Sequence, residues 1–171
     1  MTRIHAAFAM LLLVVTAAAT PGPMTSQAWA QTFDDTTAAG LGRGIVIMPS
    51  AFSVAETIDR LEGLLLANGT TVFSRIDHAA NAQGIGMELA PMQLLLFGNP
   101  KVGTPALQAD PLTGLDLPLK ALAYQDRGGA VFLAYNDPVW FAERHGIPPD
   151  HPGIQNVAAA LDQLARAATT P

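Results

Sequence analysis

The sequence predicts a single small α+β domain, built on a mostly antiparallel sheet with two long helices on one face and short helical inserts. Its 171 residues suffice for one ordinary hydrophobic core. Segments with the apolar spacing of strands and helices follow in the order strand, helix, four strands, helix. Because the last four strands are consecutive, they pair most simply as antiparallel neighbours. The sheet face opposite the helices then needs a partner, another layer or polar side chains.

The predicted domain begins with a strand and a capped helix. Residues 44–48 are mostly apolar and β-branched, and Pro49 is expected to end this strand. Ser53 and Glu56 have the spacing of a capping box, in which a Ser hydroxyl accepts a hydrogen bond from an amide of the first helical turn. Gly69 is expected to end the helix in a left-handed conformation. The apolar face of this helix consists of Val54, Ile58, Leu61 and Leu65.

The rest of the domain combines four strands with the short inserts and a last long helix. Strands are predicted over 70–76, 92–97, 119–125 and 130–135, with a hairpin turn at 126–129. Short helices are predicted over 79–83, from Thr104-Pro105 to about 109, and from Asp137-Pro138 to Gly146. An apolar stripe from Ile154 to Ala168 predicts the last helix.

The first 30 residues are typical of a cleaved export signal. Arg3 precedes an apolar run over 6–19, which is shorter than the roughly 20 residues that a membrane-spanning helix needs. The small-residue triplet at 28–30 predicts cleavage between Ala30 and Gln31, and an uncleaved membrane anchor is the alternative. We therefore expect a periplasmic or secreted protein, with a flexible arm over 31–43 and one domain over 44–168.

Composition excludes several classes of function. Half of the residues are hydrophobic and 13% are charged, so disorder is not expected over most of the chain. The formal charge is −5 and becomes −6 once Arg3 leaves with the signal. An acidic body without a basic cluster argues against nucleic acid or an anionic membrane surface as a partner. The absence of cysteine excludes disulfides, thiolate metal sites and iron–sulfur clusters, and we expect no metal and no cofactor.

Several segments between Ser53 and Gly146 resemble the domain of unknown function 302 family. In chain order these segments are SVAET at 53–57, IDHAA at 76–80, FGNPKVGT at 97–104, DLPLK at 116–120, YNDP at 135–138 and RHG at 144–146. The resemblance implies a TATA-box-binding-protein-like α+β fold with the element order given above. It implies no activity, and it implies no DNA binding, because a shared fold does not carry a function.

Five polar residues at the ends of apolar segments are the candidate ligand-binding residues: Asp77, His78, Asn99, Lys101 and Asp116. His78 follows a strand and can act as a proton shuttle or metal ligand, with Asp77 orienting its ring. The alternative is that both residues cap the following helical turn.

The segment from Gly98 to Thr104 has the glycine separation of a phosphate-binding loop, but the lysine that should follow the second glycine is absent. Lys101 can still hold a carboxylate or phosphate beside the start of a short helix, and a solvated turn is the alternative. Asp116 lies between two leucines, so we expect it to be partly buried and paired with Lys101 or Lys120.

His145 and His151 are separated by five residues, which does not place two imidazoles on one helical face as a helical zinc motif does. The leading hypothesis is an exported, non-catalytic and dimeric domain that binds a small polar or anionic ligand or a partner surface. The first alternative is a small enzyme in which His78 is the acid or base, Asp77 its orienting group and Lys101 an electrostatic stabiliser. The second alternative is a metal or haem carrier. Whether the protein is an enzyme stays open.

Overall fold

The computed structural model of the protein describes residues 44–171. Its strands are β1 (Ile45–Ser50), β2 (Thr71–Asp77), β3 (Met92–Gly98), β4 (Leu119–Gln125) and β5 (Val131–Asn136). Its helices are α2 (Val54–Ala67), α3 (His78–Gly84), α4 (Pro100–Ala109), the 3₁₀ helix η2 (Pro111–Leu115), α5 (Pro138–Arg144) and α6 (Pro152–Thr169). The predicted export signal and flexible arm lie outside the described residues.

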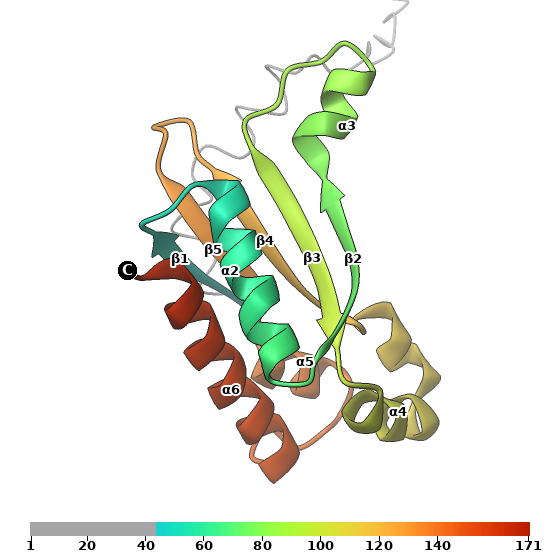
Figure 1. The fold of residues 1–171 in the computed structure, drawn as a ribbon. Helices are drawn as coiled ribbons and strands as arrows, with labels where there is room; N and C mark the ends of the chain where they lie inside the picture. The colour runs from blue at the N-terminus through green and yellow to red at the C-terminus, as the bar shows by residue number, and fades with distance from the viewer. Residues whose placement is uncertain (1–43) are drawn as a thin grey trace, which may run out of the picture. The chain divides into compact units, whose positions relative to one another are not determined.

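The five strands form one antiparallel sheet in the order β1-β5-β4-β3-β2, and α2 and α6 pack side by side on one of its faces (Figure 1). The predicted fold class is therefore confirmed, including the order strand, helix, four strands, helix. Among the helices of residues 44–171, none is long and apolar enough to cross a membrane.

The hydrophobic core lies between the sheet and these two helices. The sheet contributes Leu95, Phe97, Ala121, Ala123, Leu133 and Tyr135, and the helices contribute Val54, Ile58, Leu61, Leu65, Leu161, Ala165 and Ala168. The strand residues alternate in sequence, as a strand with one buried face requires. The helix residues recur at three- and four-residue spacing, which places them on one face of each helix. For the two long helices, the periodicity read from the sequence therefore selected the correct faces.

Helix α2 begins and ends as its sequence predicts. The Ser53 hydroxyl accepts a hydrogen bond from the backbone N–H of Glu56 at 3.2 Å. At the other end, Gly69 has φ +71°, a conformation that glycine adopts without steric cost.

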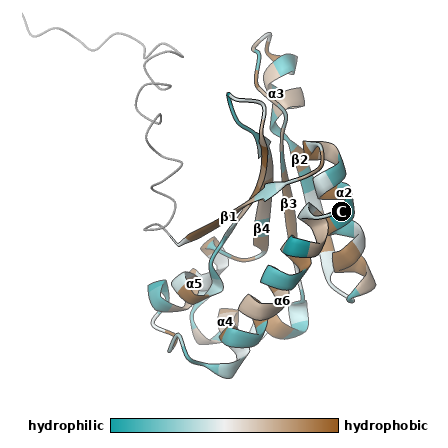
Figure 2. Cartoon of the chain, turned by 90° about the vertical axis from the view of Figure 1, so that its left-hand side faces the viewer, coloured by the Kyte–Doolittle hydropathy of each residue, from teal (hydrophilic) through white to brown (hydrophobic). Residues whose placement is uncertain are grey.

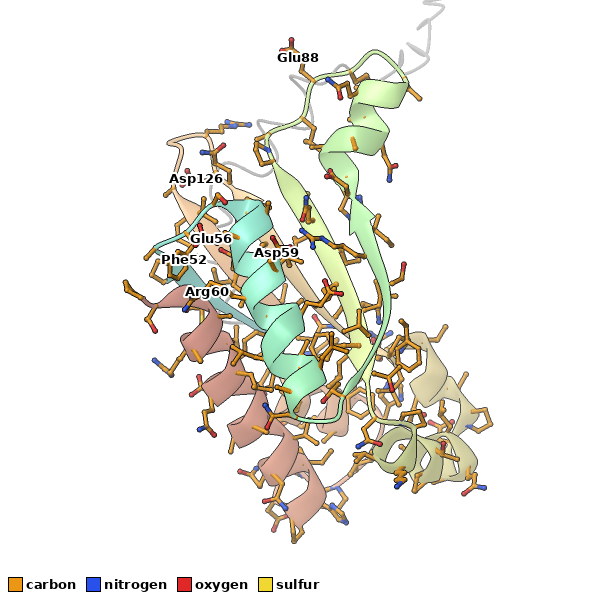
Figure 3. All side chains as sticks on the ribbon, in the orientation of Figure 1. Phe52, Glu56, Asp59, Arg60, Glu88 and Asp126 are labelled. Atoms are coloured by element: carbon orange, nitrogen blue, oxygen red, sulfur yellow. The ribbon has the colours of Figure 1, made fainter. Side chains whose placement is uncertain are left out.

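An arginine joins the two long helices. The guanidinium of Arg60 donates hydrogen bonds to the carbonyl oxygens of Ala167, Ala168 and Thr170 at the C-terminal end of α6. It also lies 4.1 Å from the centre of the Phe52 ring (Figure 3). A cation at a helix C-terminus satisfies carbonyl groups that have no partner within the helix. Arg60 therefore fixes α2 against α6.

The prediction that Pro49 ends the first strand is wrong. Strand β1 continues to Ser50, and Pro49 pairs with Phe132 of β5. Proline removes one backbone donor, which is costly in a central strand but not where a strand has a neighbour on one side only. Because β1 is the edge strand of the sheet, it accommodates this proline.

The predicted start of α4 is also wrong. The helix begins at Pro100 rather than after Thr104, and Asn99 is its N-cap, accepting a hydrogen bond from the backbone N–H of Lys101 at 3.0 Å. Asn99-Pro100 has the same chemistry as Thr104-Pro105 and precedes it, so the helix starts one turn earlier and includes Pro105. Helix η2 follows at once, with Asp110 as its N-cap, and was not predicted.

The second face of the sheet, opposite α2 and α6, also carries apolar side chains. Among residues 44–171, no long helix covers this face. Residues that alternate with the core positions point to this face, and Figure 2 shows the strands β1, β3 and β4 as largely hydrophobic. Tyr124 and Phe132 stack there across neighbouring strands, with ring centres 5.6 Å apart. Other partly exposed members of this apolar sheet face are Ile47, Leu94, Leu96 and Leu122.

Candidate functional site

The five predicted ligand-binding residues lie at two ends of the sheet. The pairing of β2 with β3 sets Asp77 opposite Gln93 and Thr71 opposite Gly98. Gly98 is the fifth residue after Gln93 along β3, which corresponds to roughly 17 Å at about 3.3 Å per residue. Asp77 and His78 are therefore at one end, and Asn99 and Lys101, which follow Gly98, are at the other.

Asp77 is the N-cap of α3. One carboxylate oxygen accepts a hydrogen bond from the backbone N–H of Ala80 at 2.9 Å, and the other accepts from the side-chain amide of Gln93 at 3.0 Å. The hydrogen bond from Ala80 is the main reason that the pKa of Asp77 lies below its ordinary value. The capping alternative is thus confirmed for Asp77, whose two oxygens bond to groups other than His78.

The arrangement that the enzyme hypothesis requires is not formed. His78 is the first residue of α3 and is half-buried beside its capping residue. Lys101 is exposed on α4 at the opposite end of the β2–β3 pair, so it cannot stabilise charge at His78. General acid–base catalysis needs such groups within hydrogen-bond reach of one substrate.

A hollow of about 840 Å³, lined by both apolar and polar residues, lies beside Asp77, between the start of α2, α3 and the loop that leads to β3. The nearby arginine is already engaged. Arg75 contacts Asp59 on α2 at 2.5 Å and donates to the side-chain oxygen of Gln93 at 2.7 Å. Figure 3 shows Asp59 on α2 and Glu88 at the far end of the loop after α3. Because the guanidinium of Arg75 already joins β2 to β3 and α2, it is not free to bind an anion in this hollow.

At the opposite end, Asp116 forms the centre of a partly buried cluster. Its carboxylate lies 2.6 Å from His145 Nε2 and 3.4 Å from Arg144 Nη1. The side chains of Asp116 and His145 are 13% and 6% exposed. His145 Nδ1 lies 3.7 Å from the carboxylate of Asp110. We call these four residues the Asp116 cluster.

The predicted partners of Asp116 are therefore corrected. Lys120 donates to the backbone carbonyl oxygens of Asp116 and Pro118, at 2.8 and 3.0 Å, and not to the carboxylate. The side-chain partners are instead Arg144 and His145 at the end of α5, where Lys101 or Lys120 was expected. The predicted partial burial of Asp116 is confirmed.

An apolar hollow of about 660 Å³ lies next to this cluster. It is formed by β2, α4, η2, the start of β4, α5 and the first turns of α6. Fourteen of its lining residues are apolar: Phe73, Pro100, Val102, Pro105, Ala106, Leu107, Leu117, Pro118, Leu119, Pro138, Phe141, Ile147, Ile154 and Val157. The others are Gly98, Gly103, Gly114 and Gly153 and the polar residues Asn99, Thr104 and His151.

The Asp116 cluster holds two walls of this apolar hollow together. Asp116 immediately precedes Leu117, which lines one wall, and His145 packs its ring 4.9 Å from the ring of Phe141, which lines another. The hydrogen bond between Asp116 and His145 thus links η2 and the start of β4 to α5. Because both groups are largely buried, this bond is shielded from water and constrains the distance between the walls.

The two histidines considered as a metal pair have separate roles. His145 belongs to the Asp116 cluster, whereas His151 is the N-cap of α6 and accepts a hydrogen bond from the backbone N–H of Gly153 at 3.1 Å. In the part of the chain that the structure describes, no group of three or more His, Asp and Glu side chains is arranged to hold a metal ion.

Of the five predicted residues, Asn99 lines the apolar hollow, Asp116 stands behind its wall, and Lys101 lies on α4 outside the lining. Sequence reasoning missed His145, although it belongs to a segment that carries the family resemblance. It also missed the hollow, because the lining comes from segments spread over 85 positions, from Phe73 to Val157. No local pattern in the sequence reports such a juxtaposition.

Comparisons with known proteins agree with the fold. The family model "Domain of unknown function DUF302" matches residues 46–168. A crystal structure of an uncharacterized conserved DUF302 protein from Bacillus stearothermophilus matches with a TM-score of 0.59 and 24% identity, covering 74% of this chain and 95% of that one. At this identity the structural match shows the fold alone.

Two curated relatives are named "Fluoride-specific ion channel FluC 1", from Brucella suis biovar 1 (strain 1330) and Brucella abortus biovar 1 (strain 9-941). Each is 46% identical over 104 residues, which is 61% of this chain. The match spans 41% and 38% of the length of these relatives, so well under half of each is similar to this chain.

We predict that Asp116→Asn destabilises the protein by about 1–3 kcal/mol, because it leaves the buried His145 ring without its carboxylate acceptor. Asp162→Asn is the matched control: it removes a carboxylate that pairs with Arg166 on the exposed surface of α6, and it should cost about 0.3–0.5 kcal/mol. Urea unfolding of both variants measures the difference. Equal losses for the two variants would contradict the structural role of the Asp116 cluster.

Proposed function

Since the chain belongs to the DUF302 family, whose description assigns no activity, we propose a function from the geometry of the chain itself: it is a non-catalytic domain that binds a small molecule in the apolar hollow. The observation that carries this proposal is the lining, in which apolar side chains from five elements (β2, α4, β4, α5 and α6) converge around a few polar ones. Ligand sites of proteins have this composition and typically measure roughly 300–1,000 Å³. At about 660 Å³, the hollow falls within that range.

Two further parts of the proposal rest on other observations. Export from the cytosol rests on the signal-like features of residues 1–30. Dimer formation rests on the apolar sheet face, because exposed apolar patches of this kind are typical of interaction surfaces. A two-fold symmetric dimer would cover the same patch on both copies.

We predict that Gly103→Leu weakens binding of Nile red, a neutral apolar dye, by about tenfold or more, a loss of about 1.4 kcal/mol. Gly103 lies in α4 at the wall of the hollow, and a Cβ there meets Leu117 Cδ1 at 3.7 Å, an ordinary contact. The larger side chain should therefore occupy ligand space without breaking the fold.

The matched control is Gly63→Leu, in α2, where an added Cβ meets no atom within 4 Å. Both changes replace a helical glycine with leucine, and the control does not approach the hollow. Dye fluorescence measures both affinities. If both variants bind Nile red as the unchanged protein does, the hollow is not the binding site.

We predict that the purified protein is dimeric and that Leu122→Glu converts it to a monomer. Leu122 lies on β4 in the apolar sheet face, so its replacement would place a charge in the dimer interface. Leu66→Glu, on the exposed surface of α2, is the control and should leave the dimer intact. Size-exclusion chromatography with light scattering gives the masses. A monomeric unchanged protein contradicts this part of the proposal.

The Brucella relatives favour a second candidate function, a domain that acts beside a membrane channel. Their names identify ion channels, and the match leaves more than half of each relative outside the similar region. Because a channel needs membrane-spanning segments, and no described helix of this chain fits one, we infer that the similar region is an accessory part of those proteins. A domain joined to a channel in one protein can act on a channel as a separate chain in another.

For this candidate we predict that the protein binds the Brucella suis relative from which the similar region has been deleted. The deleted relative would be reconstituted in lipid vesicles, and co-sedimentation and fluoride efflux would be measured with and without this protein. The intact relative is the control, because its own similar region already occupies the contact. Absence of binding to the deleted relative would remove the second candidate.

A further inference from the structure

Among the residues described, the walls of the apolar hollow carry no acidic side chain and no lysine or arginine. Its polar members are an amide, a hydroxyl and an imidazole, from Asn99, Thr104 and His151, and Lys, Arg, Asp and Glu do not occur in the lining. An ionised ligand group placed there would lose its water without gaining a counter-charge, which costs several kilocalories per mole in proteins. The lining thus favours an uncharged ligand.

The basic and acidic side chains close to the hollow already have partners within the protein. Arg144 and His145 pair with Asp116, and Lys120 donates to two backbone carbonyl groups. Lys101, which the sequence suggested as an anion-binding residue, is exposed on α4 and does not line the hollow. A ligand anion would therefore have to break a buried pair or stay outside.

The N-termini of α4 and α6, whose capping residues line the hollow, are also occupied. A helix N-terminus attracts anions through its free backbone N–H groups. In α4, Pro100 has no N–H and Asn99 accepts from the N–H of Lys101. In α6, Pro152 has no N–H and His151 accepts from the N–H of Gly153. These helix starts have therefore lost the donors that would hold a carboxylate or phosphate.

The same capping bonds define what a ligand head group can meet. Because Asn99 Oδ1 and His151 Nδ1 accept backbone hydrogen bonds, the amide nitrogen of Asn99 and Nε2 of His151 are the atoms these side chains retain for a ligand. Phe73, Val102 and Leu107 line the hollow and are also exposed to solvent. The apolar lining therefore continues to the surface, where a longer apolar chain can extend.

We propose that the ligand is a neutral amphiphile, an apolar chain with one uncharged hydrogen-bonding head group such as an alcohol, a ketone or an ester. This inference rests on the proposed function, that the hollow binds a small molecule, and it replaces the polar or anionic ligand expected from the sequence. The ligand class follows from two observations: the lining offers no counter-charge, and the starts of α4 and α6 are capped.

The test compares dodecanol with dodecanoate, which share one chain length and differ in the charge of the head group. Isothermal titration calorimetry on the purified protein should give at least about tenfold tighter binding for the alcohol. Equal or tighter binding of dodecanoate overturns the inference. Absence of binding by both ligands also overturns it.

A variant that adds a cation to the wall should reverse this preference. Val157 is half-buried on α6 and lines the hollow, so Val157→Lys should favour dodecanoate over dodecanol. Asn156→Lys adds the same charge to an exposed neighbour outside the lining and should keep the preference for the alcohol. If Val157→Lys still prefers dodecanol as the unchanged protein does, the charge of the head group does not affect binding in the hollow, and the inference fails.

Gly103→Leu separates failure of this inference from failure of the proposed function. If dodecanoate binds as tightly as dodecanol and Gly103→Leu abolishes both, the hollow is a binding site but the neutral ligand class is wrong. If dodecanol binds and Gly103→Leu leaves its affinity unchanged, the ligand binds elsewhere and both proposals fall.

Discussion

The hydrogen bond between Asp116 and His145 joins two parts of the chain that the core of the domain does not hold together. The sheet and its two long helices bury their own apolar faces and need no help from this bond. By contrast, α4, η2 and α5 are short elements at one end of the sheet, and α4 has no buried residue. The buried residues of η2 and α5 pack these elements in place, and a buried hydrogen bond between a carboxylate and an imidazole adds a direct constraint between them.

The residues that stabilise the fold are therefore largely different from those that line the proposed binding site. The core is continuous, apolar and periodic, whereas the apolar hollow is lined mainly by the short inserts, together with residues of β2, β4 and the first turns of α6. Inserts of this kind tolerate change in sequence and commonly carry binding residues on a rigid scaffold. The capped helix starts at Asn99 and His151 belong to the same arrangement, since they remove donors that would attract anions. The hollow is thereby left apolar and uncharged.

The core could be predicted from the sequence because helical and strand periodicity report burial locally. The helix after Ser53, the hairpin between β4 and β5 and the last helix all have this signal. The end of β1 and the start of α4 were predicted wrongly, in each case beside a proline. Pro49 is tolerated because β1 is an edge strand, and α4 starts at Asn99-Pro100 rather than at Thr104-Pro105. The site was harder to predict, because Asp116 meets His145 only through tertiary structure.

The state of the His145 ring tests this account most directly. Nitrogen-15 NMR of the labelled protein can resolve its ring N–H and that of the exposed His151. We expect a His145 Nε2–H that exchanges with water far more slowly than the ring N–H of His151, and that loses this protection in Asp116→Asn. A His145 ring that exchanges as fast as His151 in the unchanged protein would show that the walls of the hollow are not joined, and would contradict the account.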